Sequence, residues 1–121
     1  MEFEHYNPNP YGKNVGDCTV RALSKALGQE WRKTYFDLCI EGALRGDMPS
    51  ANATWGAYLR RNGYRRELAP EDATVSEFAS EHPRGSYILA LSGHVVCIQG
   101  GILYDSWDSS REIVLYFWRK E

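Results

Sequence analysis

The first part of the chain carries apolar residues at helical spacing. Residues 1–16 are rich in Asn, Pro and Gly and are expected to form an extended arm that closes in turns. Asp17 is a favourable N-cap for the segment CTVRALSKAL, whose apolar residues fall on one helical face. Gly28 follows directly, and helices commonly end at such a glycine. These features predict an amphipathic helix that packs inward.

Further helical patterns follow. The segment Thr74-Val75-Ser76-Glu77 has the spacing of a capping box, which marks the start of a helix. We therefore expect residues 17–83 to be mainly helical. Further helices are expected over 29–44, over 54–62 with Asn52 as its cap, and from Thr74 to near His82, and one short strand over 64–68.

From residue 84 onward the pattern becomes that of β-strands. The segments SYILAL, HVVCIQ, ILYDSW and REIVLYFW are rich in β-branched and aromatic residues and are separated by turn residues. Gly100-Gly101 between two of them is typical of a two-residue hairpin turn. Helices followed by antiparallel strands predict a single α+β domain over residues 1–121, with the helices packed on a C-terminal antiparallel sheet over residues 84–121.

Composition narrows the range of partners. The chain has 121 residues, and a chain of this size buries roughly two thirds of its unfolded surface, enough for one core without metal or disulfide. Its net charge of -2 argues against a general nucleic-acid binder, which needs positive charge to neutralise phosphates. No apolar run approaches the ~20 residues that span a bilayer. We therefore expect neither a nucleic-acid nor a membrane partner.

The cysteines and histidines give no sign of a metal site. The 3 cysteines, Cys18, Cys39 and Cys97, cannot all pair within one chain, which suggests a reducing compartment. No Cys or His pair has metal-ligand spacing, and no Gly-rich phosphate loop is present, so we expect no metal and no cofactor. The N-terminal sequence lacks the pattern of a signal peptide. A cytoplasmic location is therefore expected.

A small basic cluster comprises Arg60, Arg61, Arg65 and Arg66. Two interpretations are open: a helix C-terminus whose basic residues offset the negative end of the helix dipole, or a site for an anionic ligand. The sequence favours the first interpretation, because charge runs usually form solvated faces.

Cys18 is a candidate nucleophile. As the first residue after a predicted N-cap, its sulfur is expected at the positive end of a helix, where backbone N–H groups and the dipole favour the thiolate. Asp17 opposes this effect as an adjacent negative charge. The alternative is a buried structural cysteine at a helix start.

The hairpin supplies a partner for this thiol. If Gly100 and Gly101 form a two-residue turn, Val96 lies opposite Asp105, and His94 shares one face of the sheet with both. Asp105 is then diagonal to His94 and close enough to orient its imidazole, as acyl-transfer triads require. Trp107 falls opposite His94 and is expected to shield this hydrogen bond from water.

Three motifs resemble those of the papain superfamily. Gly16-Asp17-Cys18 enters the first helix, Gly93-His94-Val95-Val96 opens a strand, and Asp105-Ser106-Trp107 is similar to the Asn-Ser-Trp of papain-like enzymes, with an acid in place of the amide. The branch that cuts bacteriocin leaders uses Cys, His and Asp in this order. The chain is also similar to a set of small proteins of Gram-positive bacteria and their phages that share Gly-Asp-Cys, Met-Pro-Ser-Ala-Asn and a Gly-His motif.

The resemblance implies a papain-like fold and a cysteine peptidase, or a related thiol acyl-transfer enzyme, acting on a peptide or protein. Cys18 would be the nucleophile, His94 the general acid–base and Asp105 the orienting group. One position departs from the family pattern: papain-like enzymes place an oxyanion-binding glutamine six residues before the cysteine, and this chain has Gly12 there. Asn14 is the nearest upstream amide and a weak candidate for that role, with the Cys18 backbone N–H as a second donor.

Two alternatives stay open. An NlpC-type cell-wall endopeptidase has an Asp-Cys-Ser-Gly helix start similar to Asp17-Cys18-Thr19, but the glycine is missing here and no export signal is seen. A papain-like fold retained as a catalytically weak or inactive binding module, such as a phage-encoded protein that blocks a host partner, would explain Gly12.

Overall fold

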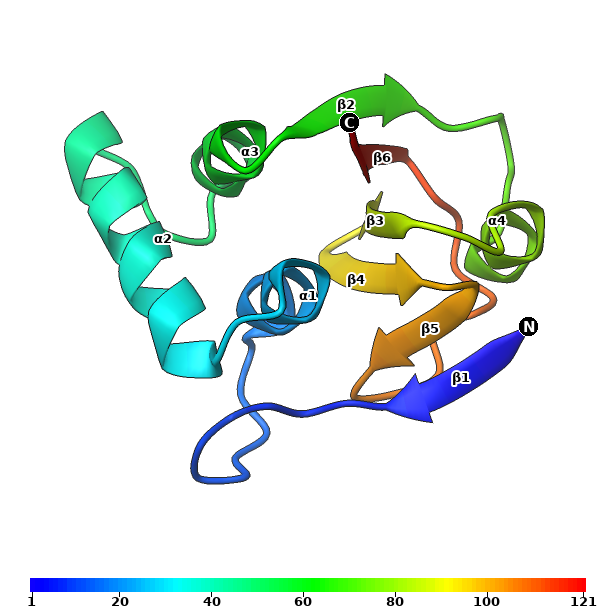
Figure 1. Cartoon of the computed structure of the whole chain (residues 1–121), viewed down its shortest axis with the longest axis horizontal. Helices are drawn as coiled ribbons and strands as arrows, with labels where there is room; N and C mark the ends of the chain where they lie inside the picture. The colour runs from blue at the N-terminus through cyan, green and yellow to red at the C-terminus, as the bar shows by residue number, and fades with distance from the viewer.

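A mixed six-stranded sheet lies at the centre of the fold in the computed structural model, which describes residues 1–121 (Figure 1). The strand order is β1-β5-β4-β3-β6-β2. The elements are β1 (Glu2–His5), α1 (Cys18–Leu27), α2 (Trp31–Arg45), α3 (Asn52–Arg61), β2 (Tyr64–Leu68), α4 (Val75–Glu81), β3 (Ser86–Leu91), β4 (His94–Gln99), β5 (Ile102–Asp105) and β6 (Tyr116–Lys120). The predicted α+β class is confirmed. None of the helices combines the length and apolar character needed to cross a membrane.

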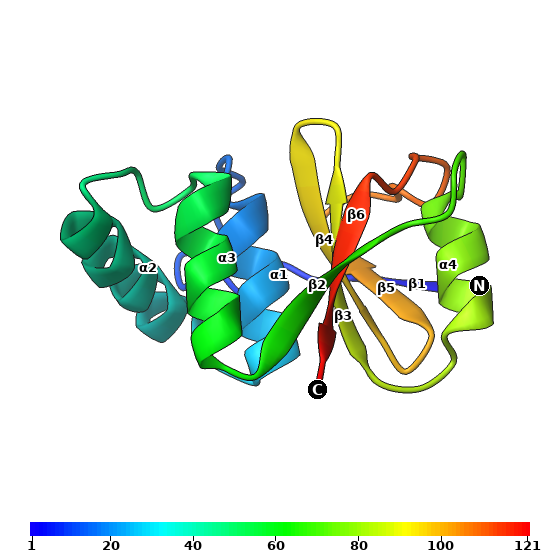
Figure 2. The same ribbon diagram turned by 90° about the horizontal axis from the view of Figure 1, so that it is seen from above.

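Helices cover both faces of this sheet (Figure 2). Helices α1 and α3 lie on one face, where their core residues pack with Ile88, Cys97 and Trp118, and α2 packs on the outer side of these two helices. Helix α4 lies on the other face, where Val75 and Phe78 pack with a second set of strand residues. Successive residues of a strand point to opposite faces of the sheet. The apolar residues of β3, β4 and β6 therefore pack in turn against the helices of one face and against α4 on the other. The sheet is therefore buried on both sides at its centre.

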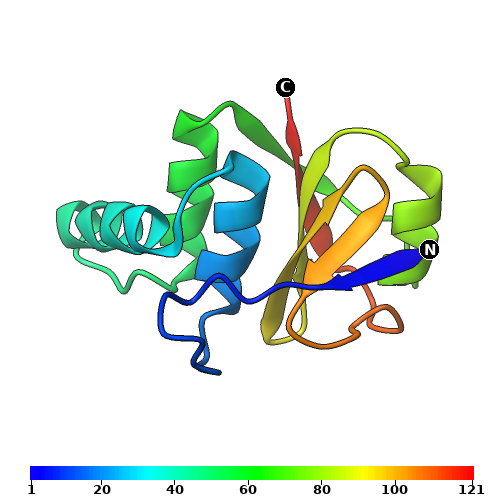
Figure 3. The same ribbon diagram turned by 60° about the horizontal axis from the view of Figure 1, so that its bottom comes forward.

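The edges of the sheet correct the sequence prediction. Strand β1 pairs in parallel with β5, and β2 pairs with β6, so the sheet is neither purely C-terminal nor purely antiparallel. The predicted N-terminal arm thus begins as a strand, and the chain from residue 6 to residue 17 then crosses from the sheet edge to the helical layer (Figure 3). The sequence EFEH contains one apolar residue and is too short to show a period, so only pairing with β5 identifies it as a strand.

The last predicted strand is shifted along the chain. The pattern predicted a strand over REIVLYFW, but β6 begins only at Tyr116, where it pairs with β3 on one side and β2 on the other. The residues before it form a connection in which Ile113 bridges to Thr74. Both halves of REIVLYFW have a high β-propensity, so propensity alone does not distinguish them. The partner strands that are available decide which half joins the sheet.

The turns and helix ends agree more closely with the sequence. Gly100 and Gly101 have φ values of 60° and 75°, and the strands pair as Gln99↔Ile102 and Cys97↔Tyr104, which confirms the predicted hairpin and its register. The capping box of α4 is present, with Thr74 and Glu77 exchanging hydrogen bonds. The N-cap of α3 is Ala51 and not Asn52, whose side chain is left for another contact.

Candidate active site

Cys18 is the first residue of α1, and its side chain is partly buried. The helix is held by Leu23, which is fully buried against the sheet, so the position of the thiol is set by the core. The backbone N–H groups at a helix start carry partial positive charge, which favours an anionic sulfur. The predicted location of Cys18 at a helix N-terminus is confirmed.

His94 and Asp105 are hydrogen-bonded at 2.7 Å between Nε2 and Oδ2. His94 opens β4 directly after a turn at Gly93, whose φ is 67°, and Asp105 is the last residue of β5. Because Nε2 is engaged by the carboxylate, Nδ1 is the ring nitrogen left for Cys18. The contact between His94 and Asp105 that the hairpin register predicted is therefore present.

The pKa values of the thiol and imidazole shift in opposite directions. Burial alone would raise the pKa of Cys18, but hydrogen bonding to the His94 side chain and to the Val95 backbone, with the charges of His94 and Arg21, lowers it below its ordinary value. Burial alone would lower the pKa of His94, but its hydrogen bonds and charge interactions with Asp105 and Cys18 raise it to about 9. At neutral pH the imidazolium is therefore retained, and the lowered pKa of Cys18 increases the fraction of thiolate beside it.

Asp105 is nearly fully buried, and both oxygens of its carboxylate accept hydrogen bonds. Its Oδ2 accepts from His94 and from Ser109 Oγ, each at 2.7 Å, and its Oδ1 accepts from the Ser106 backbone N–H at 2.7 Å and from Arg21 Nη2 at 3.1 Å. Burial alone would raise the pKa of Asp105, but the bonds from His94 and Ser109 lower it. A carboxylate held by this many donors stays ionised and fixes the ring plane of His94.

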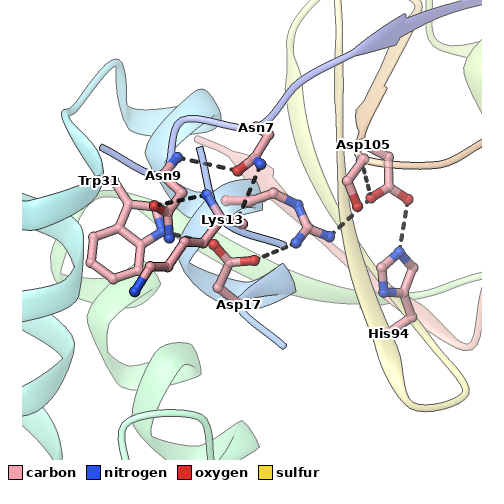
Figure 4. Close-up of polar contacts among 9 residues, drawn as sticks. Asn7, Asn9, Lys13, Asp17, Trp31, His94 and Asp105 are labelled. Atoms are coloured by element: carbon pink, nitrogen blue, oxygen red, sulfur yellow. Dashed lines mark hydrogen bonds and ion pairs between the residues drawn. The ribbon is translucent and has the colours of Figure 1, made fainter. Parts of the chain in front are cut away.

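Arg21 links Asp105 to Asp17. Figure 4 labels these two acids together with Trp31 and His94. The Arg21 guanidinium binds both carboxylates, and Arg21 as a whole is only 6% exposed. Trp31 Nε1 donates to the other oxygen of Asp17 at 2.8 Å, and Asp17 makes no side-chain cap bond to α1. Asp17 therefore occupies the predicted N-cap position of α1 but does not cap the helix with its side chain. Its charge, expected to oppose the thiolate, is paired with Arg21.

Trp107 lies against His94, with ring centroids 4.9 Å apart and planes 30° from parallel. The indole is 47% exposed, so it covers one face of the imidazole while its own outer face meets solvent. The neighbouring Asp108 is directed elsewhere, since its Oδ1 accepts from the Ser110 backbone N–H. Trp107 thus lies against the imidazole of His94. Asp105, and not Asp108, is the acid that binds this imidazole.

A cleft of about 320 Å³ opens at the thiol and imidazole. Asn14 and Gly12 are exposed on the preceding loop and do not line it. Asn52 does line it, and its Oδ1 accepts from Trp55 Nε1 at 3.2 Å. Because an indole nitrogen can only donate, the amide oxygen makes this bond, and Nδ2 of this cleft-lining residue has no hydrogen-bond partner in the protein.

A larger apolar pocket of about 400 Å³ adjoins this cleft and shares Gly16, Thr19 and Ser50 with it. Its walls include Trp31 and Tyr35, whose rings stack at 4.9 Å. The thiol is therefore flanked by a surface that can take an apolar group.

No protein-family model, curated protein or solved structure matches this chain. The chemistry available at the cleft follows from its side chains alone: a polarised thiol, an imidazole that can carry a proton, a carboxylate that holds the imidazole, and an amide donor. This is the set of groups that acyl transfer through a covalent intermediate needs.

The sequence left several of these contacts unpredicted. Arg21 stands four residues after Asp17, a spacing that brings helical side chains together, so this ion pair had a local signal. Ser109 lies only four residues after Asp105, but in a loop with no regular pattern that would place its hydroxyl. Asn52 had no signal, because the placement of α3 at the cleft depends on the whole fold.

Proposed function

We propose that the protein is a cysteine peptidase or a related thiol acyl-transfer hydrolase with a papain-like fold. The observation that carries the proposal is the His94 imidazole, which binds Asp105 at 2.7 Å and at the same time lowers the pKa of the Cys18 thiol. A cysteine with a purely structural role does not require a carboxylate-bound histidine that lowers its pKa.

The reaction would proceed in two halves. The Cys18 thiolate attacks the carbonyl carbon of the scissile bond, and the carbonyl oxygen becomes an oxyanion. As this intermediate collapses, the His94 imidazolium gives its proton to the departing amine nitrogen, leaving a thioester on Cys18. His94, now neutral, takes a proton from water, whose oxygen attacks the thioester and releases the carboxylic acid product and the thiolate.

The Asn52 amide and the Cys18 backbone N–H are the donors we assign to the oxyanion, in place of the Asn14 expected from the sequence. The free Nδ2 of Asn52 at the same cleft as the thiol supports this assignment. The order of nucleophile, histidine and acid along the chain, with the cysteine at the start of a helix packed on the sheet, supports the papain-like description.

The function is tested by offering pools of fluorogenic peptides and isopeptides to the wild type and to Cys18→Ala. We expect cleavage by the wild type only, together with an acyl adduct on Cys18 that mass spectrometry detects after rapid acid quench. Cys39→Ala, which alters a cysteine on α2 outside the cleft, is the matched control and should retain activity. Cleavage that survives in Cys18→Ala would contradict the proposal, and an unreactive Cys18 with no cleavage would favour a binding module.

A separate prediction concerns the oxyanion donor. Asn52→Ala is expected to lower kcat by about 10²-fold with little change in KM, because one donor that acts mainly on the transition state is lost. Asn14→Ala should change kcat less than about twofold. Iodoacetamide should still alkylate Cys18 in both variants at the wild-type rate, since neither change affects the thiol. Equal effects of the two substitutions on kcat would contradict the role of Asn52.

A further inference from the structure

The four arginines of the basic cluster do not share the same surroundings in the structure. Arg61 ends α3 and binds Glu41, with Nε and Oε1 2.7 Å apart. Arg65 and Arg66 are neighbours on β2, so their side chains leave opposite faces of the sheet. Only Arg60 and Arg66 line a common hollow, and the helix-dipole interpretation does not apply to Arg66 because it lies on a strand.

This hollow has a volume of about 260 Å³ and is lined by residues of α3, β2 and β6. Figure 1 shows where these three elements lie in the fold. Two aromatic rings hold the arginines in place. The Arg60 guanidinium carbon lies 5.0 Å from the ring centre of Trp118, and that of Arg66 lies 4.1 Å from the ring centre of Tyr116. Stacking on an aromatic face orients a guanidinium while leaving its N–H groups free to bind another partner.

No acid neutralises the two charges. Neither Arg60 nor Arg66 takes part in an ion pair, and no Asp or Glu lines the hollow. Two guanidinium groups facing one hollow repel each other unless an anion lies between them. The planar donor fork of arginine matches a carboxylate, the anion that a peptide carries.

The hollow adjoins the cleft of the reactive thiol. Asn52 and Tyr116 line both, while Cys18 and His94 line only the cleft. A ligand whose anionic end lies between the two arginines therefore extends past Asn52 toward the thiol.

We propose that Arg60 and Arg66 bind a carboxylate of the substrate that Cys18 attacks, so that the enzyme selects acidic peptides. This inference rests on the proposed function, because it names the substrate of the same cleft. An acidic side chain and a C-terminal carboxylate offer the same chemistry, and the experiment separates them.

The test uses three bromoacetyl dipeptides that alkylate Cys18: one ending in glutamate α-amide, one in glutamine with a free C-terminal carboxylate, and one in glutamine amide. The acidic probe that fits the hollow is expected to react about fivefold faster than the neutral probe, the size of effect that partly exposed charge contacts give. The preference should shrink as salt is raised.

Variants and a binding measurement make the result decisive. The preference should disappear in Arg60→Gln/Arg66→Gln and persist in Arg65→Gln, which removes a charge from the opposite face of β2. Unreactive acetyl analogues, titrated by NMR into Cys18→Ala, report binding without any chemistry at the thiol, so failure of the proposed function does not obscure the outcome. Equal rates and equal affinities for acidic and neutral peptides, or a preference that survives the double substitution, would overturn the inference.

Discussion

Iodoacetamide is expected to alkylate Cys18 at pH 6 at least ten times faster than Cys39 or Cys97. The thiolate is the reacting form, and the lowered pKa of Cys18 keeps more of it ionised at that pH than an ordinary thiol allows. Cys97 is at the other extreme, because complete burial raises its pKa to about 12. Brief labelling followed by mass spectrometry of the peptides measures all three rates.

The pH dependence follows from the directions of the two shifts. The Cys18 thiolate is present above its lowered pKa, and the His94 imidazolium is present below about 9, so the ion pair occupies the range between them. In His94→Ala, the alkylation profile should move upward toward that of an ordinary thiol, because the hydrogen bond and the positive charge are lost together. Equal labelling of the three cysteines at pH 6, or a profile unchanged in His94→Ala, would count against an activated thiol.

Replacing Arg21 by methionine is expected to cost about 3 kcal/mol of unfolding free energy, the usual range for removing one partner of a buried ion pair. The substitution keeps an unbranched apolar chain in place of the arginine stem but leaves the buried carboxylate of Asp17 without its cation and that of Asp105 with one donor fewer. Urea unfolding at pH 7 measures the change. Arg111→Met, at an exposed position, is the control and should stay within about 0.5 kcal/mol of wild type.

The same variant also tests the link to the thiol. Arg21 helps to lower the pKa of Cys18, so Arg21→Met should move the alkylation profile upward as well as reduce stability. Adding Asp17→Asn should recover part of the lost stability, because the uncompensated negative charge is removed. An Arg21→Met variant as stable as wild type would show that the guanidinium does not hold the two carboxylates together.

Local signals account for the parts of the fold and site that the sequence predicted correctly. Gly28 ends α1, Thr74 and Glu77 cap α4, and Gly100-Gly101 closes the hairpin. Each of these acts over a few residues, so short-range chemistry is sufficient to predict them. The contact of His94 with Asp105 belongs here too, because the residues are 11 apart and a two-residue turn sets their register.

Contacts between segments that are far apart in the sequence could be identified only from the tertiary structure. The sequence alone determined the α+β class, a cysteine at a helix start and a histidine held by an acid. Only packing decided that β1 adds to the sheet in parallel, that Arg21 reaches Asp105 from 84 residues away, and that Asn52 lines the cleft while Asn14 does not. The reason is physical: a helix or strand pattern shows which face of an element is buried, whereas the partner it meets depends on how α1 and α3 pack against the sheet.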